Sequence, residues 1–200
     1  MERLIGVFGG TFDPPHIGHL ILAVEAHLQL KLKRVLWVLT ADPPNKPEAP
    51  LTATEIRLEM LKTSIGNRPE FELSRVDIDR PGPHFAVDTL RLLSEAHPGE
   101  RWAYLMGGDS LRDILGWRDP AGFLAACDLL AVMPRPEAPA ELTALQRQLP
   151  ELKRKLRFLQ APFVALSSSD VRRRVSQGQP FEHLLTAGVA QLITSHGLYR

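Results

Sequence analysis

The sequence predicts an α/β protein built on a doubly wound parallel sheet, with a small helical region at its C-terminal end. Short apolar runs alternate with segments of helical periodicity along nearly the whole chain, and the first 40 residues have the order strand, loop, helix, strand. Such a unit forms parallel sheets, because the helix carries the chain back to the edge where the first strand began. Doubly wound sheets bind ligands beyond the carboxyl ends of their strands, so chemistry is expected in the loops there.

Hydrophobic spacing defines the first strand and helix. Residues 4–8 are a short apolar run, expected to be a buried strand that ends in a tight turn at Gly9-Gly10. The segment Ile17–Leu30 has leucine or valine at every fourth position, which is a helical period. Residues 35–40 form a second apolar run and complete the parallel unit.

The later elements continue the alternation. Thr52 and Glu55 have the spacing of a capping box at the start of a helix, and Gly197 is expected at the C′ position of the last helix. We expect strands at residues 71–78, 102–106, 129–133 and 163–166, and helices at residues 52–64, 87–96, 120–127, 140–149, 169–177 and 186–196.

Composition excludes several classes of protein. The chain has 200 residues, of which 44% are hydrophobic, which suffices for a core and is too apolar for a disordered chain. Lys and Arg number 24 and Asp and Glu 23, so a generally cationic nucleic-acid binder is disfavoured and no nucleic-acid partner is expected. Cys127 is the only cysteine, which excludes an intrachain disulfide and favours a reducing, cytoplasmic location.

Membrane association is also disfavoured. No stretch approaches the roughly 20 apolar residues that span a bilayer, and the first apolar run is too short for a signal peptide. We therefore expect small-molecule partners and no membrane. A homo-oligomer is left open.

The loop after the first strand is the most informative segment. Its glycines allow close backbone approach and unusual dihedral angles, and N–H groups there can cradle an anion. His16 and His19 are three residues apart, so a helix would place them on one face, and Gly18 between them leaves room for a ligand. Two imidazoles beside a helix N-terminus form a compact pair of donors for phosphate oxygens. The segment reads Gly9-Gly10-Thr11-Phe12-Asp13-Pro14-Pro15-His16-Ile17-Gly18-His19.

Other interpretations of the histidine pair stay open. The two residues could ligate a metal, although zinc normally needs three or four ligands, or they could be ordinary surface or capping residues. The glycine pattern is neither the Gly-x-Gly-x-x-Gly dinucleotide fingerprint nor a Walker A loop.

The string from Gly10 to His19 resembles the signature of the nucleotidyltransferase superfamily, whose His-x-Gly-His element is shared with class I aminoacyl-tRNA synthetases. The chain as a whole most resembles the bacterial nicotinate-nucleotide adenylyltransferase family. This resemblance implies a Rossmann-like sheet in a single nucleotidyltransferase domain, residues 1–200, in which residues 167–200 complete the ATP site. Further segments that match in order are Pro43-Pro44-Asn45-Lys46, Gly107-Gly108-Asp109-Ser110-Leu111 with Trp117, Leu166-Ser167-Ser168-Ser169-Asp170-Val171-Arg172, and His196-Gly197-Leu198-Tyr199.

The resemblance implies an ATP site in which His16 and His19 are the catalytic residues. Arg172 would lie in the first turn of a helix, where N–H donors and a guanidinium can hold phosphate, whereas Arg173 and Arg174 have a plain interpretation as solvated residues. The full set implied for ATP is Gly9, Gly10, Thr11, Phe12, His16, His19, Gly107, Asp109, Ser168 and Arg172.

The resemblance also implies a site for the second substrate. Lys46 would neutralise phosphate charge, or be a solvated lysine; Asp109 would bind a ribose hydroxyl, or cap a helix at residues 110–115. Trp117 would stack on a pyridine ring, or lie in the core. The full set implied for this substrate is Lys46, Phe85, Ala86, Asp109, Trp117 and Arg135.

The sequence departs from the family pattern at two places. Asn45 stands where the family usually has His, and Phe85-Ala86 stand where it has Tyr-Thr. Ala86 cannot supply a hydroxyl to a nicotinate carboxylate, so backbone N–H groups at the start of the following helix are the expected donors.

The activity implied is transfer of the adenylyl group of ATP to nicotinate mononucleotide, giving nicotinate adenine dinucleotide and pyrophosphate. The attacking phosphate is already ionised at pH 7, so no general base is required. Mg²⁺ is expected to arrive with ATP and to be held mainly by phosphates and water. The alternatives are a nicotinamide-mononucleotide or pantetheine-phosphate adenylyltransferase, and a non-catalytic nucleotide-binding module.

Overall fold

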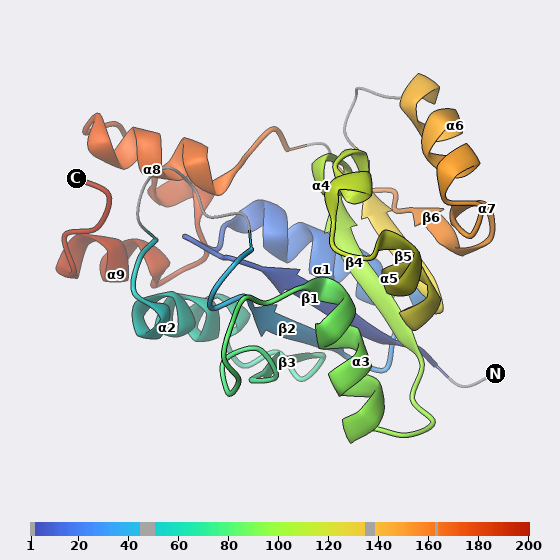
Figure 1. Ribbon diagram of the computed structural model, residues 1–200. Coiled ribbons are helices and arrows are strands. Elements are labelled where there is room, and N and C mark those ends of the chain that lie inside the picture. Colours follow the sequence, from blue (N-terminus) through green and yellow to red (C-terminus); the bar gives the residue numbers. More distant parts are fainter. Residues whose placement is uncertain (1–2, 45–50, 135–138, 163) are drawn as a thin grey trace.

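A parallel sheet forms the centre of the molecule (Figure 1). The computed structural model describes residues 3–44, 51–134, 139–162 and 164–200, and the sheet formed by these residues has the strand order β3-β2-β1-β4-β5-β6. All neighbouring strands are parallel, which confirms the predicted fold class. The strands are β1 (Ile5–Gly10), β2 (Val35–Leu39), β3 (Phe71–Ser74), β4 (Trp102–Gly107), β5 (Leu129–Met133) and β6 (Leu156–Phe158).

Helices cover both faces of the sheet. Helices α1 and α2 pack on one face, and α3, α5, α6 and α7 pack on the other. The direction of winding reverses between β1 and β4, and the loops that follow these two strands flank the crevice where such sheets bind ligands. The helices are α1 (Ile17–Leu30), α2 (Thr54–Ile65), α3 (Ala86–Ala96), α4 (Gly108–Arg112), α5 (Pro120–Ala126), α6 (Pro139–Gln148), α7 (Leu152–Lys155), α8 (Ser168–Ser176) and α9 (Val189–Ser195).

Burial on both faces explains why the strands are continuous apolar runs. Along β2, Val35, Trp37 and Leu39 face α1 and α2, whereas Leu36 and Val38 face the other layer. All five side chains are buried, as expected for a central parallel strand.

The C-terminal region packs against α2 rather than forming a separate unit. Helices α8 and α9 lie together at one end of the sheet, beside α2 (Figure 1). This arrangement brings the end of the chain back to the loop after β1. The apolar side chains that join these helices are Met60, Leu166, Val171, Leu185, Val189 and Ile193.

The strand predicted at residues 163–166 is wrong. Residues 164–166 form no strand, and Phe163 lies outside the described residues. The edge strand is instead β6, which pairs with β5 through Leu130 and Leu156. Only Leu156 of its three residues is buried, and basic residues surround it, so the segment has the composition of a solvated surface.

The predicted capping box at Thr52 is also wrong. Helix α2 begins at Thr54 with Ala53 as its N-cap, because the backbone of Thr52 is used elsewhere: its N–H donates to Asp13 and its carbonyl accepts from Arg57.

Two other element boundaries differ by a few residues from the prediction. The strand predicted at residues 71–78 stops at Ser74 and continues as a turn, and the last helix begins at Val189 rather than at residue 186. Gly197 has φ +60°, which confirms its predicted place after the last helix.

Candidate active site

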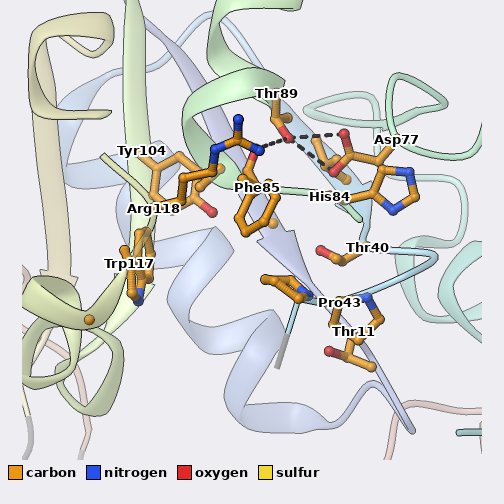
Figure 2. Close-up of a pocket in the computed structure, with 16 residues that line it drawn as sticks. Thr11, Thr40, Pro43, Asp77, His84, Phe85, Thr89, Tyr104, Trp117 and Arg118 are labelled. Atoms are coloured by element: carbon orange, nitrogen blue, oxygen red, sulfur yellow. Dashed lines mark hydrogen bonds between the residues drawn. The ribbon is translucent and has the colours of Figure 1, made fainter. Parts of the chain in front are cut away.

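Two adjoining cavities open beyond the carboxyl ends of β1 and β2, and they share Thr11 and Pro43. The first, here the aromatic cavity, has a volume of about 290 Å³ and is lined by Gly9, Gly10, Phe85, Ala86, Tyr104 and Trp117 among others (Figure 2). The second, here the histidine cavity, is lined by Phe12, Asp13, His19, Leu51, Ser168 and Arg172 in addition to the two shared residues. The structure thus brings most of the sequence-predicted residues to one region.

The two glycines that end β1 are needed because the backbone is closely approached there. A Cβ at Gly9 would lie 2.7 Å from the hydroxyl of Tyr104, and one at Gly10 would lie 2.9 Å from the ring of Phe12. The predicted unusual dihedral angles are wrong for both glycines, since both lie within β1 and neither has a positive φ. The positive φ falls on Phe12, at 48°, whose buried ring packs against Phe8.

The two histidines are stacked at the start of α1. His16 is the N-cap residue, and its backbone N–H donates to Nδ1 of His19 at 3.1 Å. The ring centroids lie 3.7 Å apart with an angle of 27° between the planes. His19 lines the histidine cavity and His16 is buried behind it. A Cβ at Gly18 would lie 3.1 Å from the His16 ring, so this ring occupies the room that Gly18 leaves.

The environment of His19 keeps its ring neutral. Burial lowers the pKa of His19 well below the usual 6.5, and the neighbouring His16 lowers it further. Because Nδ1 accepts a backbone hydrogen bond, the proton of the neutral ring is on Nε2. His19 is therefore a neutral donor with a fixed tautomer rather than a cation.

Asp13 connects the loop after β1 to the C-terminal region. Its carboxylate accepts from the hydroxyl of Tyr199 at 2.6 Å and from the N–H of Thr52 at 3.2 Å. Its backbone carbonyl accepts from Arg172 at 2.7 Å, and the next carbonyl accepts from Ser168 at 2.8 Å. Burial and the bond to Asp13 raise the pKa of Tyr199, so the phenol remains protonated and donating.

Arg57 lines neither cavity but supports the loops between them, and the sequence did not reveal it. Its guanidinium is 1% exposed and donates to the carbonyls of Thr11, Thr40 and Ala41 at 2.7–2.9 Å, and its Nε donates to that of Thr52. Burial lowers its pKa from the usual value. These bonds fix the loops after β1 and β2, which form the boundary between the two cavities. An arginine within a helix carries no sequence signal for such a role.

The three consecutive arginines of α8 have different surroundings. Arg172 lines the histidine cavity, whereas Arg173 pairs with Asp170 at 2.8 Å and Arg174 donates to a backbone carbonyl at 2.9 Å. Ser167 caps the helix in a capping box with Asp170. These contacts agree with the plain interpretation of Arg173 and Arg174.

Trp117 belongs to both the core and the aromatic cavity. Its ring lies 5.0 Å from that of Phe123 and 6.2 Å from that of Tyr104, in edge-to-face arrangements. Phe85 is the N-cap residue of α3 and Ala86 is its first residue, so backbone N–H groups of this helix start are near the cavity. The Trp117 ring is therefore held in place by packing against Phe123 and Tyr104, and it also lines the aromatic cavity.

Some predicted site residues line neither cavity. Gly107 ends β4, and Asp109 lies in the first turn of α4, 3.6 Å from Arg112. Because Gly107 is the N-cap of α4, Asp109 is not the cap of a helix at residues 110–115. Lys46 and Arg135, together with the departure at Asn45, lie outside the described residues.

The described residues contain no group of three or more His, Cys, Asp or Glu side chains that could hold a metal ion, so the histidine pair has no third protein ligand among them. Within the same part of the chain, no helix is both long and apolar enough to cross a membrane.

The fold and the loop after β1 define a nucleotidyltransferase, and the family model described as Cytidylyltransferase-like matches residues 7–174. A "Probable nicotinate-nucleotide adenylyltransferase" of Thermomicrobium roseum is 38% identical over 200 residues, which cover 100% of this chain and 92% of the relative. A protein of the same name from Thermus thermophilus is 38% identical over 98% of this chain and 99% of its own. The chain belongs to the nicotinate-nucleotide adenylyltransferase family.

A solved structure has the same fold. The Plasmodium falciparum nicotinic acid mononucleotide adenylyltransferase complexed with NaAD superposes with a TM-score of 0.80 over 99% of this chain and 98% of that one. The two sequences are 18% identical, so this likeness concerns the fold alone.

Proposed function

We propose that the two cavities hold the two substrates of a nicotinate-nucleotide adenylyltransferase. The reaction transfers the adenylyl group of ATP to nicotinate mononucleotide and yields nicotinate adenine dinucleotide and pyrophosphate, in NAD biosynthesis. The observation that carries the proposal is that a cavity with phosphate donors and a cavity with aromatic walls meet at Thr11 and Pro43. An α-phosphate from one side and a 5′-phosphate from the other would react at this junction.

The histidine cavity is proposed to hold the phosphates of ATP. His19 offers its Nε2–H, and Arg172 with the N–H groups at the start of α8 offers charged and dipolar donors for the leaving pyrophosphate. Since the nucleophile is an ionised phosphate, catalysis consists of positioning and charge stabilisation. Residues 167–200 complete this site through Ser168 and Arg172. His16 acts through its stacking on His19.

The aromatic cavity is proposed to hold nicotinate mononucleotide. Trp117 would stack on the pyridine ring, and backbone N–H groups near Phe85 and Ala86 would bind its carboxylate. Asp109 remains proposed for a ribose hydroxyl, since it lies beyond the carboxyl end of β4. Lys46 and Arg135 remain proposed as contacts for phosphate and substrate anions, on the family resemblance.

Nucleotidyltransferases typically use a divalent metal with ATP, and Mg²⁺ is the metal we assign. The chain's described residues offer no carboxylate and histidine cage, and the carboxylate of Asp13 is occupied by Tyr199 and Thr52. These residues fit a metal that is held by phosphate oxygens and water, as Mg²⁺ usually is. When bound, it would neutralise charge on the phosphates.

Pyrophosphate release tests the proposal. Purified protein is given ATP and Mg²⁺ with nicotinate mononucleotide, nicotinamide mononucleotide, phosphopantetheine or no acceptor. We expect release with nicotinate mononucleotide, lower kcat/KM with the nicotinamide compound, and background release in the other two reactions. Binding of ATP without release for any acceptor would support a nucleotide-binding module instead.

A further inference from the structure

The aromatic cavity must distinguish a carboxylate from an amide, because nicotinate and nicotinamide mononucleotides differ only there. The threonine hydroxyl that the family places in this helix start is missing, since this chain has Ala86. This inference rests on the proposed function and concerns which side chain replaces that hydroxyl. The polar side chains that face the cavity are therefore decisive: among the described lining residues, the carboxylate is that of Asp77, the guanidinium is that of Arg118 and the imidazole is that of His84.

The carboxylate of Asp77 is already paired with neighbouring side chains. Its carboxylate is 3% exposed, accepts from Arg80 at 2.7 Å, and accepts from the hydroxyl of Thr89 at 2.9 and 3.0 Å (Figure 2). Both oxygens are thus engaged within the protein. The same bonds occupy the hydroxyl of Thr89, so this threonine, one turn further along α3, cannot supply the missing donor.

His84 is also fully engaged. Its Nδ1 accepts from the N–H of Asp42 at 2.9 Å, so its proton is on Nε2, which donates to the carbonyl of Arg80 at 3.1 Å. Both ring nitrogens therefore serve to join two loops. The ring presents no remaining donor to a ligand.

Arg118 is differently placed. Its guanidinium carbon lies 4.6 Å from the centroid of the Phe85 ring, at the wall of the cavity next to Trp117 (Figure 2). Its ion pair is with Asp88, at a long 3.9 Å; its charge also acts on Asp119, and 60% of the Arg118 side chain is exposed. Neighbouring Arg91 differs, since it is held by Asp119 at 2.9 Å. Arg118 therefore retains N–H donors for a ligand.

We propose that Arg118 is a specificity-determining residue, whose guanidinium binds the nicotinate carboxylate in place of the hydroxyl that Ala86 lacks. The cation–π contact with Phe85 holds the guanidinium at the cavity wall, and a planar fork matches the two oxygens of a carboxylate. An amide would present an NH₂ group to one of these donors and carries no charge to attract them. Affinity comes from the stack on Trp117, whereas the choice of acid over amide comes from Arg118.

The test is the ratio of kcat/KM for nicotinate mononucleotide to that for nicotinamide mononucleotide. Arg118→Gln removes the charge and keeps a polar side chain of similar reach. We expect the ratio to fall by about 10-fold or more, mainly through a higher KM for the nicotinate compound, as loss of a charged hydrogen bond predicts. The ratio for Arg118→Lys should lie between those of the wild type and Arg118→Gln, because lysine keeps the charge but lacks the planar fork of the guanidinium.

Arg91→Gln is the matched control, because Arg91 approaches the same Asp88 from outside the cavity; its ratio should equal that of the wild type. A ratio unchanged in Arg118→Gln, or equal losses with both substrates, would overturn the inference and leave the proposed function standing. A wild-type protein that used neither mononucleotide would contradict the proposed function, and this inference with it.

Discussion

At the scale of single residues, the site works through neutral and tightly fixed groups as much as through charges. His19 lies next to the proposed phosphate position, yet burial and His16 keep it uncharged. A preorganised neutral donor loses little on reaction, since no solvent must reorganise around it. Two histidines three residues apart suggest a pair of donors from sequence alone. In the stacked geometry, His19 lines the cavity and His16 supports its ring.

This arrangement predicts the titration of His19. In ¹⁵N-edited NMR spectra that correlate ring nitrogens and carbons, we expect His19 as the Nε2–H tautomer, unchanged from pH 8 down through pH 6.5. Because its folded pKa lies below the unfolded value, the stabilisation it contributes is complete above about pH 6.5 and is lost as the pH falls below it. A His19 signal that titrates at pH 6.5 or above would contradict this account.

At the scale of elements, the start of α8 separates two similar arginines by function. Arg172 donates to the carbonyl of Asp13 in the loop after β1 and to the hydroxyl of Ser169, whereas Arg174 donates to the nearby carbonyl of Pro180. Arg172 is nearer to the N-terminus of α8 and lines the histidine cavity, whereas Arg174 lies further along the helix and does not line this cavity.

We therefore expect Arg172→Ala to lower kcat/KM for ATP by about 10- to 100-fold, from the loss of charged hydrogen bonds to phosphate, and Arg174→Ala to change it by less than about threefold. Steady-state kinetics at saturating nicotinate mononucleotide measures both, with melting temperatures recorded alongside. Equal losses of kcat/KM in Arg172→Ala and Arg174→Ala would contradict the separate phosphate-binding role proposed for Arg172.

At the scale of the whole molecule, the two ends of the chain meet at the site. Tyr199 bonds to Asp13 across 186 residues, and Arg172 and Ser168 bond to the same loop. The C-terminal region thus determines the shape of the loop that carries the histidines.

Tyr199→Phe should accordingly raise the KM for ATP several-fold, because the bond to a carboxylate is worth about 1.5–3 kcal/mol and its loss frees the loop. The KM for nicotinate mononucleotide should change less. A chain lacking only Arg200 is the control and should behave as the wild type. A lower melting temperature with both KM values unchanged would mean that Tyr199 serves stability alone.

Strands and site residues that have a local sequence pattern could be predicted from the sequence. Contacts between residues far apart in the chain could not. Apolar runs predicted the sheet because each central strand is buried on both faces, and most of the described site residues that the motifs and the family resemblance predicted line one of the two cavities. Basic residues around Leu156 concealed β6. The contacts of Arg57 and the role proposed for Arg118 depend on loops brought together by folding, so no spacing along the chain could indicate them.

The most direct test of this account is a crystal structure with nicotinate adenine dinucleotide bound. We predict the pyridine ring against Trp117 in the aromatic cavity, the diphosphate at the junction near Thr11 and Pro43, and Nε2 of His19 within hydrogen-bonding distance of a phosphate oxygen. A dinucleotide bound in the opposite direction, with adenine against Trp117, or bound away from both cavities, would contradict the assignment of the two cavities.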